Sequence, residues 1–198
     1  HSFLANFLIS FHAVDEKSDM EAYIKRRGEV ARALDQSVEQ AKLSAEAGVR
    51  PPRFAYDQAV QESTNVITGA PFGAGKDSPL WADAKTKIKA LVDGGKLTPD
   101  VAKAMEASAK AALVDTVKPS YERVIAYLNA DRPNASEQSQ GVGAFKDGAE
   151  FYNAMLEVQT TTNMSADAIH ELGLKEVARL RGEMEAIREK VGFQGDLT

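Results

Sequence analysis

The sequence predicts an all-α protein, a multi-helix bundle of long amphipathic helices, and three observations lead to this prediction. Apolar residues recur at intervals of three and four over long stretches, as they do along one face of a helix. Residues typical of helix starts and helix ends bound these stretches. Alternation of apolar and polar residues with a period of two, which is typical of strands, is not sustained anywhere in the 198 residues.

The first long helix is expected to begin at Ser18 and to end at Gly48. Ser18 and Glu21 have the spacing of a capping box, in which each side chain binds a free backbone N–H of the first turn. Gly48 suits the left-handed conformation that follows the last turn of many helices. A second helix is expected over residues 52–68, and the glycine-rich residues 69–76 that follow it predict a loop.

Two further helices are predicted by a repeated signal, a hydroxyl residue followed by proline. The signal occurs at Ser78-Pro79 and again at Thr98-Pro99. The hydroxyl residue caps the helix, and proline takes the first helical position, where its missing N–H has no helical partner to lose. The first of these helices is expected to stop at Gly94, where two glycines follow one another.

The helix that begins after Thr98 is expected to continue to Leu128, with a kink or a split at Pro119, because proline removes a helical hydrogen bond. Residues 130–145 are mostly small, polar or helix-breaking, and we interpret them as a surface connection and as the best internal boundary. Apart from that boundary, residues 1–198 are interpreted as a single helical subdomain.

Two helices are expected in the last part of the chain. The first covers residues 147–158, and the second has Ser165 as its N-cap and runs to Gly192 with an apolar stripe opposite charged residues. Between them, residues 160–162 are three threonines, which are β-branched and disfavoured in helices. We therefore expect a short extended segment at this threonine run.

The composition excludes several classes of function. With 24 basic and 29 acidic side chains the net charge is -5, so a nucleic-acid partner is not expected. The absence of cysteine excludes disulfides, thiol nucleophiles and cysteine-ligated metals. The most apolar stretch, residues 3–14, is shorter than the roughly 20 residues of a membrane-spanning helix, and we expect no membrane-spanning segment.

Two motifs resemble known sites but lack a decisive residue. His170-Glu171 begins like the zinc signature H-E-x-x-H, but Leu174 stands where the second histidine is needed on the same helix face. The glycine-rich loop resembles a phosphate-binding loop, but Asp77 replaces the hydroxyl residue that would bind magnesium. We therefore predict no catalytic residue, no metal ligand and no cofactor site in this chain.

Two segments combine aromatic and polar residues in a way that packing alone does not explain. They are V-R-P-P-R-F at residues 49–54, and residues 148–162, which run from G-A-E-F-Y to T-T-T. The second lies within residues 147–177, which include D-G-A-E-F-Y-N-A-M-L and T-T-T-N-M-S-A-D-A-I-H-E-L-G-L. In order and content they resemble the bacterial family DUF885, and this resemblance extends over nearly the whole chain. The resemblance implies an all-helical zinc metallopeptidase of the gluzincin kind, exported to the bacterial cell envelope or anchored there by a lipid.

The resemblance also implies that this chain is a middle portion of a longer protein. The zinc-binding helix of the family would lie beyond Thr198, so zinc and a peptide-like substrate are expected in the full-length protein only. By the same resemblance, Tyr152, Thr161 and His170 are expected to line the substrate cleft. Gln159 departs from the family, whose members often carry histidine there.

Two functions remain open from the sequence. The first is a helical scaffold and substrate-cleft portion of a DUF885-type zinc-dependent hydrolase, not catalytic on its own. The alternative is a non-catalytic helical module that binds a peptide or a protein. Because a middle portion exposes apolar surface that neighbouring segments normally cover, a homodimer of this fragment is also expected.

Overall fold

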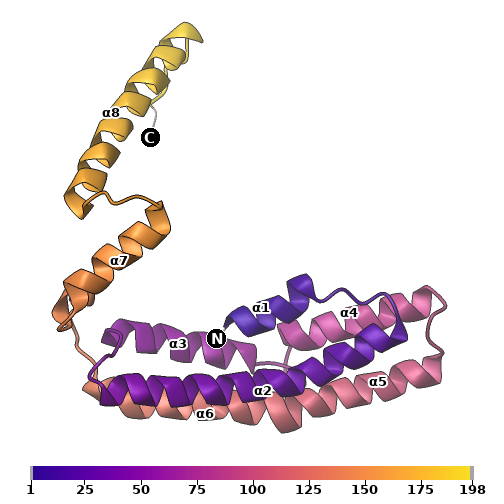
Figure 1. Cartoon of the computed structure of the whole chain (residues 1–198). Helices are drawn as coiled ribbons and strands as arrows, with labels where there is room; N and C mark the ends of the chain where they lie inside the picture. Colours follow the sequence, from indigo (N-terminus) through magenta and orange to yellow (C-terminus); the bar gives the residue numbers. More distant parts are fainter. Residues whose placement is uncertain (1, 197–198) are drawn as a thin grey trace. The chain divides into compact units, whose positions relative to one another are not determined.

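The computed structural model describes residues 2–196, with side chains from Ala5 onward, and within this range it contains helices and no strand. The predicted all-α class is therefore confirmed. The chain divides into two compact units, His1–Ser139 and Gln140–Thr198 (Figure 1). The division falls inside the interval 130–145 that the sequence marks as a boundary.

The first unit is a bundle in which helices distant in sequence lie side by side. Helix α2 runs along α6 (Figure 1) and η1, and contacts also join α3 to α6 and α4 to α5. Its elements are α1 (Ser2–Phe11), α2 (Lys17–Glu46), α3 (Arg53–Val66), α4 (Pro79–Asp93), α5 (Pro99–Ala111), the π-helical segment η1 (Ala112–Val117), α6 (Lys118–Asp131) and the single 3₁₀ turn η2 (Arg132–Asn134).

The core of this unit is formed by side chains from α1, α2, α4, α5, η1 and α6. From α2, Met20, Tyr23 and Leu34 are fully buried. The apolar stretch at residues 3–14 forms α1, whose Leu8 is buried in the same core. Because burial of one large apolar side chain contributes about 1.5–3 kcal/mol, this shared core holds the helices together. The buried stripe of α4 has helical spacing and consists of Leu80, Ala84, Ile88 and Leu91.

The long helix expected after Thr98 is interrupted by η1, which ends at Val117, two residues before Pro119 in the first turn of α6, so its regular α-helical geometry breaks just before the proline. Buried residues recur here at intervals of four: Ala109, Leu113, Val117 and Tyr121. An α-helix has about 3.6 residues per turn, so side chains spaced by four residues would shift gradually to another face of the helix. A π-helical segment takes more residues per turn, so η1 keeps the stripe directed at α2.

The cap residues agree with the predictions except at the start of α2. This helix begins at Lys17, and the carboxylate of Asp19 accepts a hydrogen bond from the backbone N–H of Glu16 at 2.9 Å. The expected cap at Ser18 is therefore wrong by two residues, because a carboxylate can satisfy the same free N–H groups. At the other end Gly48 has φ +78°, as expected.

The glycine-rich loop after α3 closes on itself. The backbone N–H of Ala70 donates to Lys76 O at 2.9 Å, and the N–H of Ser78 donates to Ala70 O at 2.7 Å. Gly69 has φ +84°, and an added Cβ there would lie 2.2 Å from Lys76 O. The loop therefore requires this glycine for its own geometry, and the amide of Ala70 is not free to bind a phosphate.

The second unit contains the 3₁₀ turn η3 (Val142–Ala144), α7 (Gly148–Thr160) and α8 (Ala166–Lys190). The threonine run forms a turn instead of the expected extended segment. Thr160 ends α7, and Thr161 adopts the left-handed conformation with φ 56°. The prediction is wrong because α7 continues through Thr160, whose hydroxyl donates to Leu156 O at 2.8 Å, and the left-handed backbone of Thr161 then turns the chain.

The buried cap of α4 allows a stability prediction. Ser78 is 1% exposed, and its Oγ accepts a hydrogen bond from the N–H of Trp81 at 3.4 Å. The variant Ser78→Ala is expected to lower the free energy of unfolding by about 1 kcal/mol, measured by urea denaturation. The control Thr86→Ala, at an exposed site of α4, is expected to change it by less than about 0.5 kcal/mol. Equal losses in both variants would contradict this role of Ser78.

Candidate functional site

The three residues expected to line a cleft all lie in the second unit, on different elements. Tyr152 is on α7 and is 48% exposed, Thr161 follows the last residue of α7, and His170 is exposed on α8. The hydroxyl of Thr161 donates to Thr160 O at 2.7 Å. Within the described residues, no hydrogen bond or ion pair joins any two of the three.

Thr161 lines a shallow hollow at the end of α7, with neighbours from the same turn, and neither Tyr152 nor His170 contributes to it. The hollow's lining consists of Glu157, Val158, Thr161, Thr162 and Asn163. The described part of the chain therefore does not bring the three expected residues into one cleft.

Both helices of the second unit expose large apolar side chains. On α7 these are Phe151, Tyr152, Met155 and Val158. No residue of α8 is buried. Five of the exposed apolar residues on α8 and at its C-cap are named here the α8 seam: Val177, Leu180, Met184, Ile187 and Val191. Monomeric proteins rarely leave apolar patches of this kind open to water.

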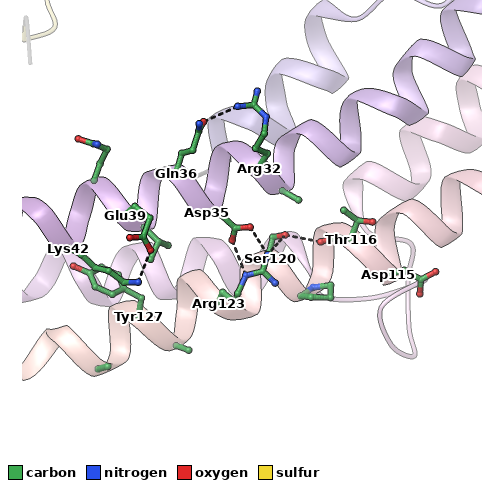
Figure 2. Close-up of a pocket in the computed structure, with 16 residues that line it drawn as sticks. Arg32, Asp35, Gln36, Glu39, Lys42, Asp115, Thr116, Ser120, Arg123 and Tyr127 are labelled. Atoms are coloured by element: carbon green, nitrogen blue, oxygen red, sulfur yellow. Dashed lines mark hydrogen bonds and ion pairs between the residues drawn. The ribbon is translucent and has the colours of Figure 1, made fainter.

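A broad open groove of about 1320 Å³ lies in the first unit between α2 and α6 (Figure 2). Its rim is formed by ion pairs. Arg123 on α6 binds both carboxylate oxygens of Asp35 on α2, at 2.9 and 2.8 Å. Along α2, Lys42 binds Glu39 at 2.7 Å. Tyr127 supplies an aromatic wall near Lys42 (Figure 2).

The electrostatics of this groove indicate a structural contact between helices. A hydrogen bond from Arg123 holds the pKa of Asp35 below its usual value, so this carboxylate stays ionised and paired. Burial raises the pKa of Tyr127, which therefore stays protonated. Exposed pairs of this kind contribute at most about 1 kcal/mol. The ionised and paired Asp35 and the protonated Tyr127 are unsuited to general-base catalysis at neutral pH.

A partly buried polar cluster joins α1, α2 and α4. The hydroxyl of Tyr23 donates to the carboxylate of Asp83, which also accepts from Lys87 at 2.8 Å. Lys87 reaches the end of α1 as well, donating to Leu8 O at 3.1 Å. Burial, followed by the hydrogen bond with Asp83, raises the pKa of Tyr23, although the Arg27 guanidinium opposes that rise. Tyr23 is consequently a neutral donor that fixes Asp83.

Arg27 is the largest fully buried side chain, and it contacts three helices. Its Nη2 donates to Leu80 O at 2.9 Å, and its Nη1 donates to Ala109 O at 3.3 Å. The guanidinium lies 4.4 Å from the centre of the Tyr23 ring, which attracts the positive charge. Its Nε has no hydrogen-bond partner within the described residues. Arg27 thus bonds α2 to α4 and to the end of α5.

The V-R-P-P-R-F segment, which the sequence marked without a role, clamps the end of α6. Arg50 Nε lies 3.1 Å from each carboxylate oxygen of Asp131. Asp131 also accepts from the Tyr56 hydroxyl at 2.7 Å and from Asn134 Nδ2 at 3.2 Å. Burial alone would raise the pKa of Asp131, but the hydrogen bonds from Tyr56, Asn134 and Arg50 outweigh it, and that pKa lies below its usual value.

The second arginine of the same segment holds the chain that follows α6. Arg53 Nη1 binds the Glu137 carboxylate at 2.5 Å, its Nη2 donates to Ala135 O at 3.1 Å, and its backbone N–H donates to Ser136 O at 2.8 Å. Together Arg50 and Arg53 fix residues 131–137, just before the boundary between the two units. Sequence reasoning missed this clamp, because its partners are more than 80 positions away in sequence.

Within residues 2–196 the structure shows no group of three or more His, Asp or Glu side chains that could hold a metal ion. His170 is followed one turn later by Leu174, so a second ring nitrogen is missing on that face. Within the described residues, therefore, no set of side chains fits a zinc site. In the same range no helix combines the length and the apolar character needed to cross a bilayer.

These features define an all-helical bundle, followed in sequence by a unit with two long helices, and they assign no reaction to the chain. A solved structure has this fold, that of a protein described as "putative lipoprotein" from Colwellia psychrerythraea. The match has a TM-score of 0.83 at 20% sequence identity and covers 98% of this chain but 32% of that protein. This chain therefore spans about a third of the solved relative.

The family model described as bacterial protein of unknown function, DUF885, matches residues 1–198. The chain therefore belongs to the DUF885 family, as the resemblance of its motifs predicted. No curated protein sequence matches the chain significantly.

Proposed function

We propose that this chain is a helical scaffold portion of a longer DUF885 protein, a zinc-dependent hydrolase of the peptidase kind, and is not catalytic on its own. One observation carries the scaffold role: the same fold extends over 98% of this chain but occupies only 32% of the solved relative. The buried polar contacts of Arg27 and Asp131 fix one helix to another. The peptidase activity is supported by the resemblance of the motifs alone.

Tyr152, Thr161 and His170 are our candidates for contacts with a peptide-like substrate in the longer protein. All three are exposed, and a phenol, a hydroxyl and an imidazole can each bind a peptide carbonyl or N–H. Since the described residues offer no ligand set for zinc, we assign the metal to the longer protein and derive no step through it. An envelope location is part of the same proposal, supported by the description of the solved relative as a lipoprotein.

The experiment is a measurement of metal content and peptide hydrolysis. In the longer protein we expect one zinc ion per chain by elemental analysis and hydrolysis that is lost on chelation. In the 198-residue chain we expect neither stoichiometric zinc nor hydrolysis. The variants Tyr152→Ala and His170→Ala of the longer protein are expected to raise KM several-fold, whereas Glu189→Ala, an exposed control on α8, is expected to leave it unchanged. A longer protein without zinc would contradict the hydrolase proposal.

A second candidate function, a non-catalytic module that binds a peptide or a protein, is favoured by the exposed apolar side chains of α7. Phe151, Met155 and Val158 offer the surface that such a ligand would cover. The same measurements separate the two candidates, because a binding module retains peptide affinity in the absence of zinc and hydrolyses nothing.

A further inference from the structure

The α8 seam has the spacing of a coiled-coil contact. Its residues follow one another at intervals of three, four, three and four, and each is between 47% and 69% exposed. This mean spacing of 3.5 residues is that of a and d positions, which pack as knobs into the holes of a neighbouring helix. The spacing therefore indicates that the partner of α8 is another helix, crossing at a small angle of about 20°.

The charged residues beside the seam define the chemistry of that partner. On one flank Glu176 and Glu183 are both bound by Arg179, at 2.8 and 2.6 Å, so their charges are neutralised within α8. On the other flank Arg188 is bound by Glu185 at 2.8 Å. Arg181, on that same flank, is exposed and makes no ion pair within the described residues. A partner helix would therefore place a carboxylate beside Arg181.

We propose that the α8 seam is covered by an amphipathic helix of the same longer protein, from the part outside these 198 residues, with apolar heptad positions and an acidic residue facing Arg181. The solved relative supports this choice of partner, because 68% of its length lies outside the part that matches this chain. This inference shares with the proposed function only the premise that the chain is part of a longer protein. It does not depend on any hydrolase activity.

The test uses single thiols on α8, since the 198 residues contain no cysteine. The longer protein, with any other cysteine replaced by serine, carries either Met184→Cys in the seam or Glu189→Cys, the matched control on the opposite face of the helix. We expect a maleimide to react at least about tenfold more slowly at position 184 than at position 189, because reaction then requires local opening of the contact. The protein should also sediment as a monomer.

Two results would overturn the proposal. Equal reaction rates at the two positions would show that nothing covers the seam. Protection that disappears on dilution, together with dissociation of a dimer in sedimentation, would show that a second copy covers it. If Met184→Cys fails to fold, Val177→Cys replaces it at the equivalent heptad position. Absence of zinc or of peptide hydrolysis would contradict the proposed function and would leave the labelling result unchanged.

Discussion

Replacing Arg27 with alanine is expected to lower the free energy of unfolding by about 3–5 kcal/mol, the range for large buried side chains reduced to alanine. Arg27 is 0% exposed and bonds Leu80 O and Ala109 O, so Arg27→Ala would leave a cavity at the junction of three helices. It would also remove the cation above the Tyr23 ring. The measurement is urea denaturation followed by circular dichroism.

The variant Arg27→Met separates the volume of this side chain from its charge. Methionine fills much of the same space. It also removes a buried cation that forms no ion pair with a carboxylate within the described residues and whose Nε has no hydrogen-bond partner there. Since a buried charge costs free energy to desolvate, Arg27→Met is expected to lose about 1–2 kcal/mol less than Arg27→Ala. The control Arg32→Ala, exposed on the same helix, should change stability by less than about 0.5 kcal/mol. Equal losses for methionine and alanine would show that the hydrogen bonds dominate.

Replacing Asp131 with alanine is expected to lower the free energy of unfolding by about 3 kcal/mol, because it leaves Arg50 and the Tyr56 hydroxyl without their acceptor. Tyr56 is 3% exposed, so water cannot replace that acceptor without a rearrangement. Asp93→Asn is the control, because Asp93 pairs with Lys89 at an exposed site and contributes at most about 1 kcal/mol.

The effect of Asp131 is also expected to depend on pH. Burial raises the pKa of Asp131, but hydrogen bonds from Tyr56, Asn134 and Arg50 outweigh it and leave the folded-state pKa below that of the unfolded chain. The stabilisation is therefore fully present above the unfolded pKa, about 3.9, and is lost as the pH falls through the folded value. The difference in unfolding free energy between the wild type and Asp131→Asn should thus shrink as the pH falls below about 4. A difference that stays constant from pH 7 to pH 3 would contradict the ionised clamp.

The helix limits were largely predictable because their signals are local. Ser78, Thr98 and Ser165 each accept a hydrogen bond from a backbone N–H three residues further on, as predicted for N-caps. Gly48 and Pro119 mark breaks because of their own backbones: glycine readily adopts a positive φ, and proline lacks the N–H of a helical hydrogen bond. There were two errors. At Ser18 the neighbouring carboxylate of Asp19 takes the expected capping role, and at the threonine run α7 continues through Thr160 before the chain turns at Thr161.

The candidate site was predictable in smaller part. The motifs that carry the resemblance identified the family correctly, but Tyr152, Thr161 and His170 do not meet in one cleft within the described residues. Their roles stay predictions, to be tested in the longer protein. The segment that contains Arg50 and Arg53 was visible in the sequence as unusual. Its partners could not be predicted from the sequence, because the folding of the chain decides which acidic residue lies nearby.

By itself the sequence determined that this protein is helical and where most helices begin and end, because caps, breaks and the three-to-four spacing of apolar residues act over a few positions. Its motifs also identified the family. Only the tertiary structure decided that Arg27 is buried, that Arg50 holds Asp131, and that η1 keeps the buried stripe directed at α2. These contacts join residues that are up to 82 positions apart, and their free energy depends on burial, which no local pattern of residues specifies.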